Sequence, residues 1–187
     1  MDRRGIILII FMAFWFLSGP GSQPVVREDR VINDFETDSD LDHLHWKCRT
    51  LFSLSDEHPG HGHYGLKLEL FPSMYPGVSF RGYPRRFMGY KDFRVDIFNP
   101  ESQGSHIALR IDDKQKDPVY DDRYNHRFDL QPGMNHLVIP LESLQTPLGR
   151  PLDLCNIRAL TFFMVNPTET KVLYMDNLRL TVSTTRS

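Results

Sequence analysis

The sequence predicts an all-β fold, an antiparallel β-sandwich of the jelly-roll type preceded by a short apolar N-terminal segment. From residue 31 onward, short runs alternate apolar and polar side chains, which is the period of a strand with one buried face. Turn-forming dipeptides such as Pro59-Gly60 and Pro132-Gly133 separate these runs. No later segment sustains a helical period, so we expect the strands to form two packed sheets.

The expected strands are short and lie close together along the chain. They cover residues 31–36, 45–54, 65–71, 77–82, 91–99, 105–113, 126–130, 134–141, 156–165 and 171–182. Only residues 142–146 suit a single turn of helix. In the last run the apolar register changes phase after Met175, so we expect a β-bulge at Asp176-Asn177.

Length and composition indicate one globular domain. The chain has 187 residues, of which 40% are hydrophobic and 25% are charged, and this is enough for a single core. The formal net charge of -2 gives no support for nucleic-acid binding, which needs a basic excess or a clustered basic face. We therefore predict no nucleic-acid partner.

The N-terminus has the pattern of an export signal. Arg3 and Arg4 precede an apolar run at 5–17, and small residues follow at 18–22. The run is shorter than the roughly 20 apolar residues of a spanning helix, so a cleaved signal peptide and an uncleaved membrane anchor both remain open. Either one predicts an exported protein, periplasmic or extracellular. We expect a linker at 23–30, the sandwich domain at 31–182 and a tail at 183–187.

Two cysteines, Cys48 and Cys155, fit an oxidising compartment. A disulfide between them would close a long loop and stabilise the fold by roughly 4 to 5 kcal/mol on the chain-entropy model. Two buried free thiols are the alternative, because cysteine is also an ordinary core residue.

Three of the expected strands carry charged outer rows. Residues 65–71, 91–99 and 105–113 each alternate apolar side chains with charged ones. If these strands are neighbours, pairs such as Arg94 with Asp112 or Lys67 with Asp96 would neutralise each other across the sheet.

The strand at 105–113 and the loop after it form the main candidate ligand site. This stretch places arginines and acids beside tyrosines, namely Arg110, Asp112, Tyr120, Asp121, Arg123 and Tyr124. Such a mixture suits a polyol, whose hydroxyls bond to charged groups while its C–H faces stack on aromatic rings. We expect Arg110 and Asp112 to hydrogen-bond a saccharide and Tyr120 or Tyr124 to stack on it.

A second group of aromatic and arginine residues at 75–90 competes with this site. Tyr83 and Arg85 are its main candidate ligands. The alternative is that these aromatic side chains close one end of the sandwich.

Several segments together resemble the carbohydrate-binding jelly rolls of the galactose-binding-like superfamily. They are VINDFE, HYGLKLEL, QPGMNHLVIPL, DLCNIRALTFFMV and LYMDNLRL, in that order. The stretch YDDRYNHRFDLQPGMN is similar to domains of exported bacterial proteins and to domains appended to membrane proteins of the VanZ type. The resemblance covers about residues 31 to 182.

The resemblance implies a structural calcium at one edge of the sandwich. The matching acidic positions are Glu36 and Asp176, with Asp34 as a further candidate. Carboxylate oxygens suit this hard cation. The alternative for Glu36 and Asp176 is a capping hydrogen bond or a salt bridge at the strand ends.

The predicted function is that of a non-catalytic carbohydrate-binding module. A jelly-roll hydrolase or lyase is the first alternative, but a glycosidase needs two carboxyl groups about 5 to 10 Å apart. Asp112 and Asp113 are adjacent on a strand and so point to opposite faces. The sequence has no G-x-S-x-G, H-E-x-x-H or P-loop motif. The second alternative is a module for interaction or assembly with another envelope protein.

Overall fold

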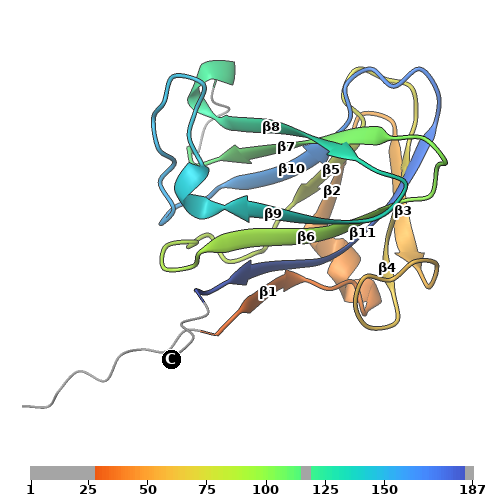
Figure 1. The fold of residues 1–187 in the computed structure, drawn as a ribbon, viewed down its shortest axis with the longest axis horizontal. Helices are drawn as coiled ribbons and strands as arrows, with labels where there is room; N and C mark the ends of the chain where they lie inside the picture. The colour runs from red at the N-terminus through yellow and green to blue at the C-terminus, as the bar shows by residue number, and fades with distance from the viewer. Residues whose placement is uncertain (1–27, 115–118, 184–187) are drawn as a thin grey trace, which may run out of the picture.

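The computed structural model describes residues 28–114 and 119–183 and confirms the antiparallel β-sandwich. Sheet A has the strand order β3-β4-β11-β6-β9, with β1 also pairing to β11. Sheet B has the order β2-β5-β10-β7-β8. Figure 1 shows the two sheets as layers, with β8 and β9 facing each other at one side of the sandwich.

The strands agree closely with the expected runs. Sheet A consists of β1 (Arg30–Asn33), β3 (Thr50–Ser55), β4 (Gly65–Leu70), β6 (Asp92–Asn99), β9 (Gly133–Pro140) and β11 (Lys171–Thr181). Sheet B consists of β2 (Leu44–Lys47), β5 (Gly77–Phe80), β7 (Ser105–Asp112), β8 (Tyr124–Leu130) and β10 (Ala159–Phe163). Short 3-10 helices lie at η1 (Asp38–His43), η2 (Tyr120–Asp122) and η3 (Leu141–Ser143).

One expected strand, residues 45–54, is two strands in different sheets. The chain leaves β2 at Cys48, whose φ of 51° lies in the left-handed region, and enters β3 in sheet A. The Thr50 hydroxyl fixes this crossing, because it donates to the Lys47 carbonyl at 2.8 Å and accepts from the Gly77 amide at 2.7 Å. Alternation alone does not reveal the break, because both halves keep the period of a strand.

The core fills the space between the sheets. Apolar residues at alternate positions face inward, so Leu66, Leu68 and Leu70 on β4 are fully buried. Phe93 of sheet A and Phe162 of sheet B meet across the core with ring centroids 6.4 Å apart. Each such side chain contributes roughly 1.5–3 kcal/mol through burial. The outward rows of both sheets are thus left for other contacts.

The predicted bulge in the last strand is confirmed. The register between β11 and β6 shifts between Asp176 and Arg179, and Asn177 has a φ of 55°. The extra residue returns Leu178 and Leu180 to the core after Met175.

Within the described residues, no helix is long and apolar enough to cross a membrane. The expected export signal or anchor at 1–22 lies outside the described residues, as do most of the linker and of the tail. These boundaries stay predictions.

Candidate functional site

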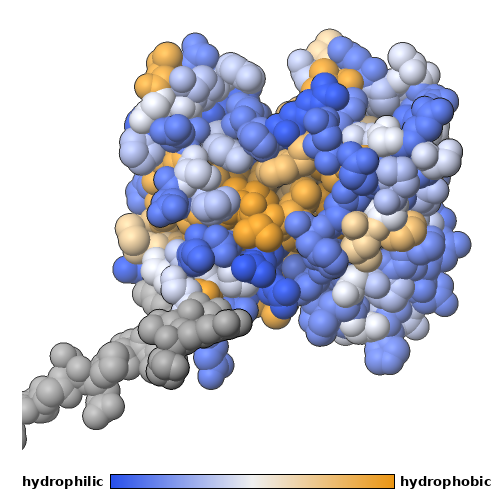
Figure 2. Space-filling view, viewed as in Figure 1, coloured by the Kyte–Doolittle hydropathy of each residue, from blue (hydrophilic) through white to orange (hydrophobic). Residues whose placement is uncertain are grey.

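A groove crosses the outer face of sheet B. The groove has a volume of ≈ 600 Å³, which is within the range of small-ligand sites. Figure 1 shows loops rising above sheet B on both sides, η2 on one side and the blue β10–β11 connection on the other. Figure 2 shows a notch between two raised, mainly polar lobes in the same place.

Two rows of residues form the floor of this groove, because the strand register sets their outward side chains side by side. In the first row Thr161 on β10, Arg110 on β7 and Asn125 on β8 lie directly opposite one another. The second row runs from Lys47 on β2 through Gly77, Phe163 and Ala108 to Arg127 on β8. Ala108 has only a methyl side chain and lines the groove between Phe163 and Arg127, whereas Phe163 covers Gly77, where an added Cβ would lie 2.6 Å from the Phe163 Cβ.

Aromatic side chains stand on two sides of the floor. Tyr75 lines the groove and packs edge-on against Phe163, with ring centroids 5.8 Å apart. Tyr120 of η2 also lines the groove and is 61% exposed. The Arg123 guanidinium lies 5.7 Å from the centre of the Tyr120 ring, which favours a cation–π contact. The groove thus combines flat apolar surfaces with hydrogen-bond donors.

Arg110 and Asp112 form an ion pair on the same strand. Arg110 Nε donates to both carboxylate oxygens of Asp112 at 2.9 Å, and Arg110 Nη2 lies 2.7 Å from Asp112 Oδ2. Arg110 lines the groove, but Asp112 is buried and is not among the lining residues. Asp112 therefore orients Arg110. The expectation that Asp112 hydrogen-bonds a saccharide in the groove is wrong in this geometry.

The side chain of Tyr124 points to the opposite face of sheet B from that of Arg110. It is opposite Ile111 in the register and belongs to the hydrophobic core, with 9% of its surface exposed. Burial raises the pKa of its hydroxyl to about 12. The expectation that Tyr124 stacks on a ligand held by Arg110 and Asp112 is thus wrong in its geometry, because neighbouring residues of β8 face opposite sides. Asp121 is exposed and does not line the groove.

Tyr124 contributes instead to a second hollow, where β8 and β9 face each other. This hollow measures ≈ 660 Å³. Its apolar lining includes Phe128, Val138 and Ile139, and Figure 2 shows apolar surface at this side of the sandwich. Tyr120 lines both this hollow and the groove.

Tyr83 and Arg85 do not line the groove. The Tyr83 ring packs against Phe87, with centroids 6.3 Å apart, and its buried hydroxyl has no hydrogen-bond partner within the described residues. Burial raises the pKa of Tyr83. Arg85 is exposed. The competing site at 75–90 therefore contributes only Tyr75 to the groove, and the alternative of aromatic side chains that close the sandwich describes Tyr83 better.

Comparison with known proteins supports the fold strongly, although the sequence matches no protein-family model and no curated protein. A family 11 carbohydrate-binding module from Clostridium thermocellum, in complex with a β-1,3-1,4-mixed-linked tetrasaccharide, matches with a TM-score of 0.64 and 17% identity. The match covers 83% of this chain and 96% of that one. The chain has the jelly-roll fold of carbohydrate-binding modules.

Two larger proteins contain the same jelly roll as one part. An exo-β-agarase matches with a TM-score of 0.66 and 16% identity, over 82% of this chain and 25% of the agarase chain. A xylanase of Clostridium thermocellum with family 22 binding and family 10 catalytic modules, complexed with xylohexaose, matches with a TM-score of 0.58 and 11% identity. That match covers 84% of this chain and 29% of the other. The similarity to VanZ-type proteins stays a prediction.

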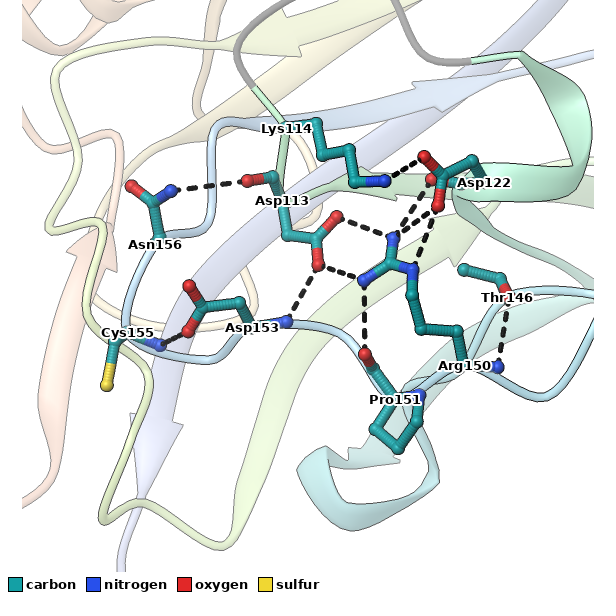
Figure 3. A network of polar contacts seen from close by, with 9 residues as sticks. All are labelled: Asp113, Lys114, Asp122, Thr146, Arg150, Pro151, Asp153, Cys155 and Asn156. Carbon is teal, nitrogen blue, oxygen red and sulfur yellow. Dashed lines mark hydrogen bonds and ion pairs between the residues drawn. The ribbon is translucent and has the colours of Figure 1, made fainter.

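An ion pair between the buried Asp113 carboxylate and the half-buried Arg150 guanidinium braces the rim of this fold beside η2. Arg150 contacts both carboxylate oxygens of Asp113, at 2.6 and 3.0 Å, and its Nε donates to Asp122 at 2.9 Å (Figure 3). Asp122 also pairs with Lys114, and the Asp153 amide donates to Asp113 at 2.8 Å. The network ties the loop after β7 to residues 150–153 and so holds η2 beside the groove.

The charges in this network explain the acidity of Asp113. Burial alone would raise its pKa, but hydrogen bonds from Arg150 and from the Asp153 amide outweigh burial and lower the pKa. Hydrogen bonding with Asp113 in turn raises the pKa of Arg150. Sequence reasoning did not single out Arg150, because nothing in the local sequence pairs it with an acid 37 residues away.

The predicted calcium ligands Glu36 and Asp176 both contact the loop between β3 and β4. Glu36 accepts from the amides of His63 and Tyr64, at 2.9 and 3.2 Å, and these hydrogen bonds lower its pKa. Asp176 accepts from the amides of Gly60 and His61 at 2.8 Å.

Burial raises the pKa of Asp176 to about 6. Asp34 is half-buried after β1. Within the described residues no three His, Cys, Asp or Glu side chains are grouped so that they could hold a metal ion. In this arrangement the two carboxylates act as hydrogen-bond acceptors for the loop, and the calcium stays a prediction.

The predicted disulfide is absent. Cys48 and Cys155 are both free and exposed, so the alternative of two buried thiols is also wrong. Cys48 lies at the sharp turn after β2 and lines the groove, whereas Cys155 follows Asp153 outside it. The left-handed backbone conformation of Cys48 allows the chain to cross from one sheet to the other, and its thiol forms no disulfide.

Proposed function

We propose that the chain is a non-catalytic module that binds a saccharide in the groove across sheet B. The observation that carries this proposal is the juxtaposition of Tyr75 and Tyr120 with Arg110 and Asn125 around one groove of ≈ 600 Å³. Aromatic faces stack on the C–H surfaces of sugar rings, while the polar groups bond to hydroxyls. The solved structures with this fold include modules in complex with a tetrasaccharide and with xylohexaose, which supports the same class of ligand.

The composition of the groove favours binding over hydrolysis. Among the described residues that line it there is no Asp or Glu, whereas a glycosidase needs two carboxyl groups that flank the scissile bond. Asp112 is close by, but it is already held by Arg110. As part of this proposal, residues 1–22 direct export, so the module acts in the periplasm or outside the cell.

Affinity electrophoresis of the full chain in gels containing neutral or acidic polysaccharides tests the proposal. We expect at least one polysaccharide to retard the chain, and we expect Tyr75→Ala and Tyr120→Ala each to weaken binding about tenfold, a loss of about 1.4 kcal/mol. Tyr64→Ala is the matched control, because Tyr64 is an exposed tyrosine outside the groove. Unchanged retardation of both groove variants would overturn the assignment.

A variant in the apolar hollow between β8 and β9 separates saccharide binding in the groove from the alternative of an assembly module. Val138 is 46% exposed in this hollow and does not line the groove. We expect Val138→Asp to leave saccharide binding unchanged. A loss of binding equal to that of Tyr75→Ala would move the site to the hollow.

A further inference from the structure

The groove across sheet B is positively charged, although the chain as a whole is slightly acidic. Its described lining residues include Lys47, Arg110, Arg123 and Arg127 but no acid, while the formal net charge of the chain is -2. We propose that the saccharide bound here is a polyanion, with carboxylate or sulfate groups repeated along its length. This inference rests on the proposed function of the groove.

Neighbouring acids cancel only part of this charge. Asp112 neutralises Arg110 from the same face of β7, with 2.7 Å between Arg110 Nη2 and Asp112 Oδ2. Arg127 lies 3.5 Å from Asp129, but the two side chains are 64% and 79% exposed, so their attraction is weak and is screened by salt. Lys47 and Arg123 form no ion pair within the described part of the chain. A positive excess therefore remains.

The cations lie at opposite sides of the sheet. In the second floor row Lys47 belongs to the edge strand β2 and Arg127 to the edge strand β8. Four steps between neighbouring strands separate them, which corresponds to about 19 Å. A single charged group cannot contact both side chains. A polymer with a charge on successive sugar units can, because it extends across the floor between them.

Hydrogen-bonding capacity points to the same class of ligand. Arginine and lysine side chains only donate, whereas each hydroxyl of a neutral sugar both donates and accepts. Arg123 Nε and Asn125 Nδ2 are buried donors without a partner among the described residues. The Thr161 hydroxyl already shares a hydrogen bond of 2.7 Å with Ser79. Donors thus dominate the groove, and carboxylate or sulfate groups, which only accept, complement them.

Matched pairs of polysaccharides test the proposal with the full chain. Polygalacturonate and its fully methyl-esterified form share a backbone and differ in the carboxylate charge, while dextran sulfate and dextran differ in sulfate. We expect the charged member of at least one pair to bind about tenfold more tightly at about 50 mM salt, and we expect this preference to shrink at about 300 mM because salt screens the charges. The preferred pair identifies the anionic group.

Charge-removing variants locate the effect. We expect Lys47→Gln and Arg127→Gln each to reduce the preference for the charged polymer by roughly threefold or more. Lys91→Gln makes the same change of net charge at an exposed position outside the groove and should leave the preference intact. An equal loss in the Lys91 variant would mean unspecific attraction and would overturn the inference.

The remaining outcomes separate this inference from the proposed function. Equal binding of charged and neutral polymers would overturn the polyanion and leave the saccharide groove standing. Failure to bind any polysaccharide would remove both. Tighter binding of a single-stranded oligonucleotide than of either charged polysaccharide, at the same salt concentration, would assign the groove to nucleic acid instead.

Discussion

The outer faces of the two sheets have the same alternating pattern of charged residues but differ in how the charges are balanced. On sheet A, Lys67 pairs with Glu57 at 3.1 Å, and Arg94 pairs with Asp92 at 3.3 Å. On sheet B, the lining of the groove contains cations and no acid among the described residues. Alternation therefore identifies the row that faces outward, but it does not show whether its charges are cancelled.

The difference arises from which strands are neighbours. The predicted pairing of Arg94 with Asp112 is wrong, because β6 and β7 belong to different sheets. The predicted pairing of Lys67 with Asp96 is also wrong, because β11 lies between β4 and β6. Asp112 pairs instead with Arg110 on its own strand.

The strongest test of this comparison is at the rim of the groove, where the ion pair of Arg150 with Asp113 has a buried carboxylate and a half-buried guanidinium. Arg150→Met leaves the Asp113 carboxylate, whose side chain is 2% exposed, without its cation. We expect the free energy of unfolding at pH 7 to fall by about 2 kcal/mol, because the buried carboxylate loses its charged hydrogen-bond donors while solvent screens part of the effect. Urea unfolding measures the change. Arg127→Met is the control, because its pair with Asp129 is exposed and should contribute little. Equal effects of the two variants would contradict the bracing role.

The pH dependence of the same pair gives a second test. Burial alone would raise the pKa of Asp113, but the hydrogen bonds and charge of Arg150, together with the Asp153 amide, lower it. The contribution of Asp113 to stability is therefore complete above the unfolded pKa of about 3.9 and is lost as the pH falls through the folded pKa. In Arg150→Met the lowering effect of the arginine is lost. Burial then raises the pKa of Asp113, and the hydrogen bond from the Asp153 amide opposes burial only in part. We expect the difference in unfolding free energy between the two proteins to be largest at pH 7 and to shrink below about pH 4. A constant difference from pH 7 to pH 3.5 would contradict this.

Much of the fold could be predicted from local sequence, and much less of the site. The alternation of Leu66, Leu68 and Leu70 predicts a strand whichever strands are its neighbours, because only one face needs to be buried. The site depends on register between distant strands. The alternation of β7 alone predicts that Arg110 faces outward, but Tyr75 lies near it only because β5 and β7 both pair with β10. The prediction for Tyr124 is wrong because β8 begins at Tyr124 and not at residue 126, and composition does not show which face of the sheet its first residue occupies.

Calcium binding would break the contrast between the two faces, since it would place a charge-binding site on the sheet A side as well. Asp176 lies opposite Asp96 in the register of β11 and β6, and neighbouring carboxylates favour a cation. If calcium binds at Glu36 and Asp176 as predicted, EDTA lowers the melting temperature, because a ligand at 100 times its Kd adds about 2.7 kcal/mol. Asp176→Asn should abolish the effect of EDTA. An unchanged melting temperature would leave only the hydrogen bonds to the loop.

The two cysteines offer the mildest test, because one lies in the groove and the other outside it. Cys48 and Cys155 are both exposed and free, so we expect a maleimide reagent to label both in the folded protein, with mass spectrometry to locate the label. A saturating saccharide should slow labelling of Cys48 severalfold by covering it, and Cys155 should react at an unchanged rate. If neither cysteine reacted, the free thiols would be contradicted and the predicted disulfide would again be the better account. Equal protection of both would show that the ligand acts through a general change in the protein rather than by occupying the groove, and the distinction between the faces would then lose its functional meaning.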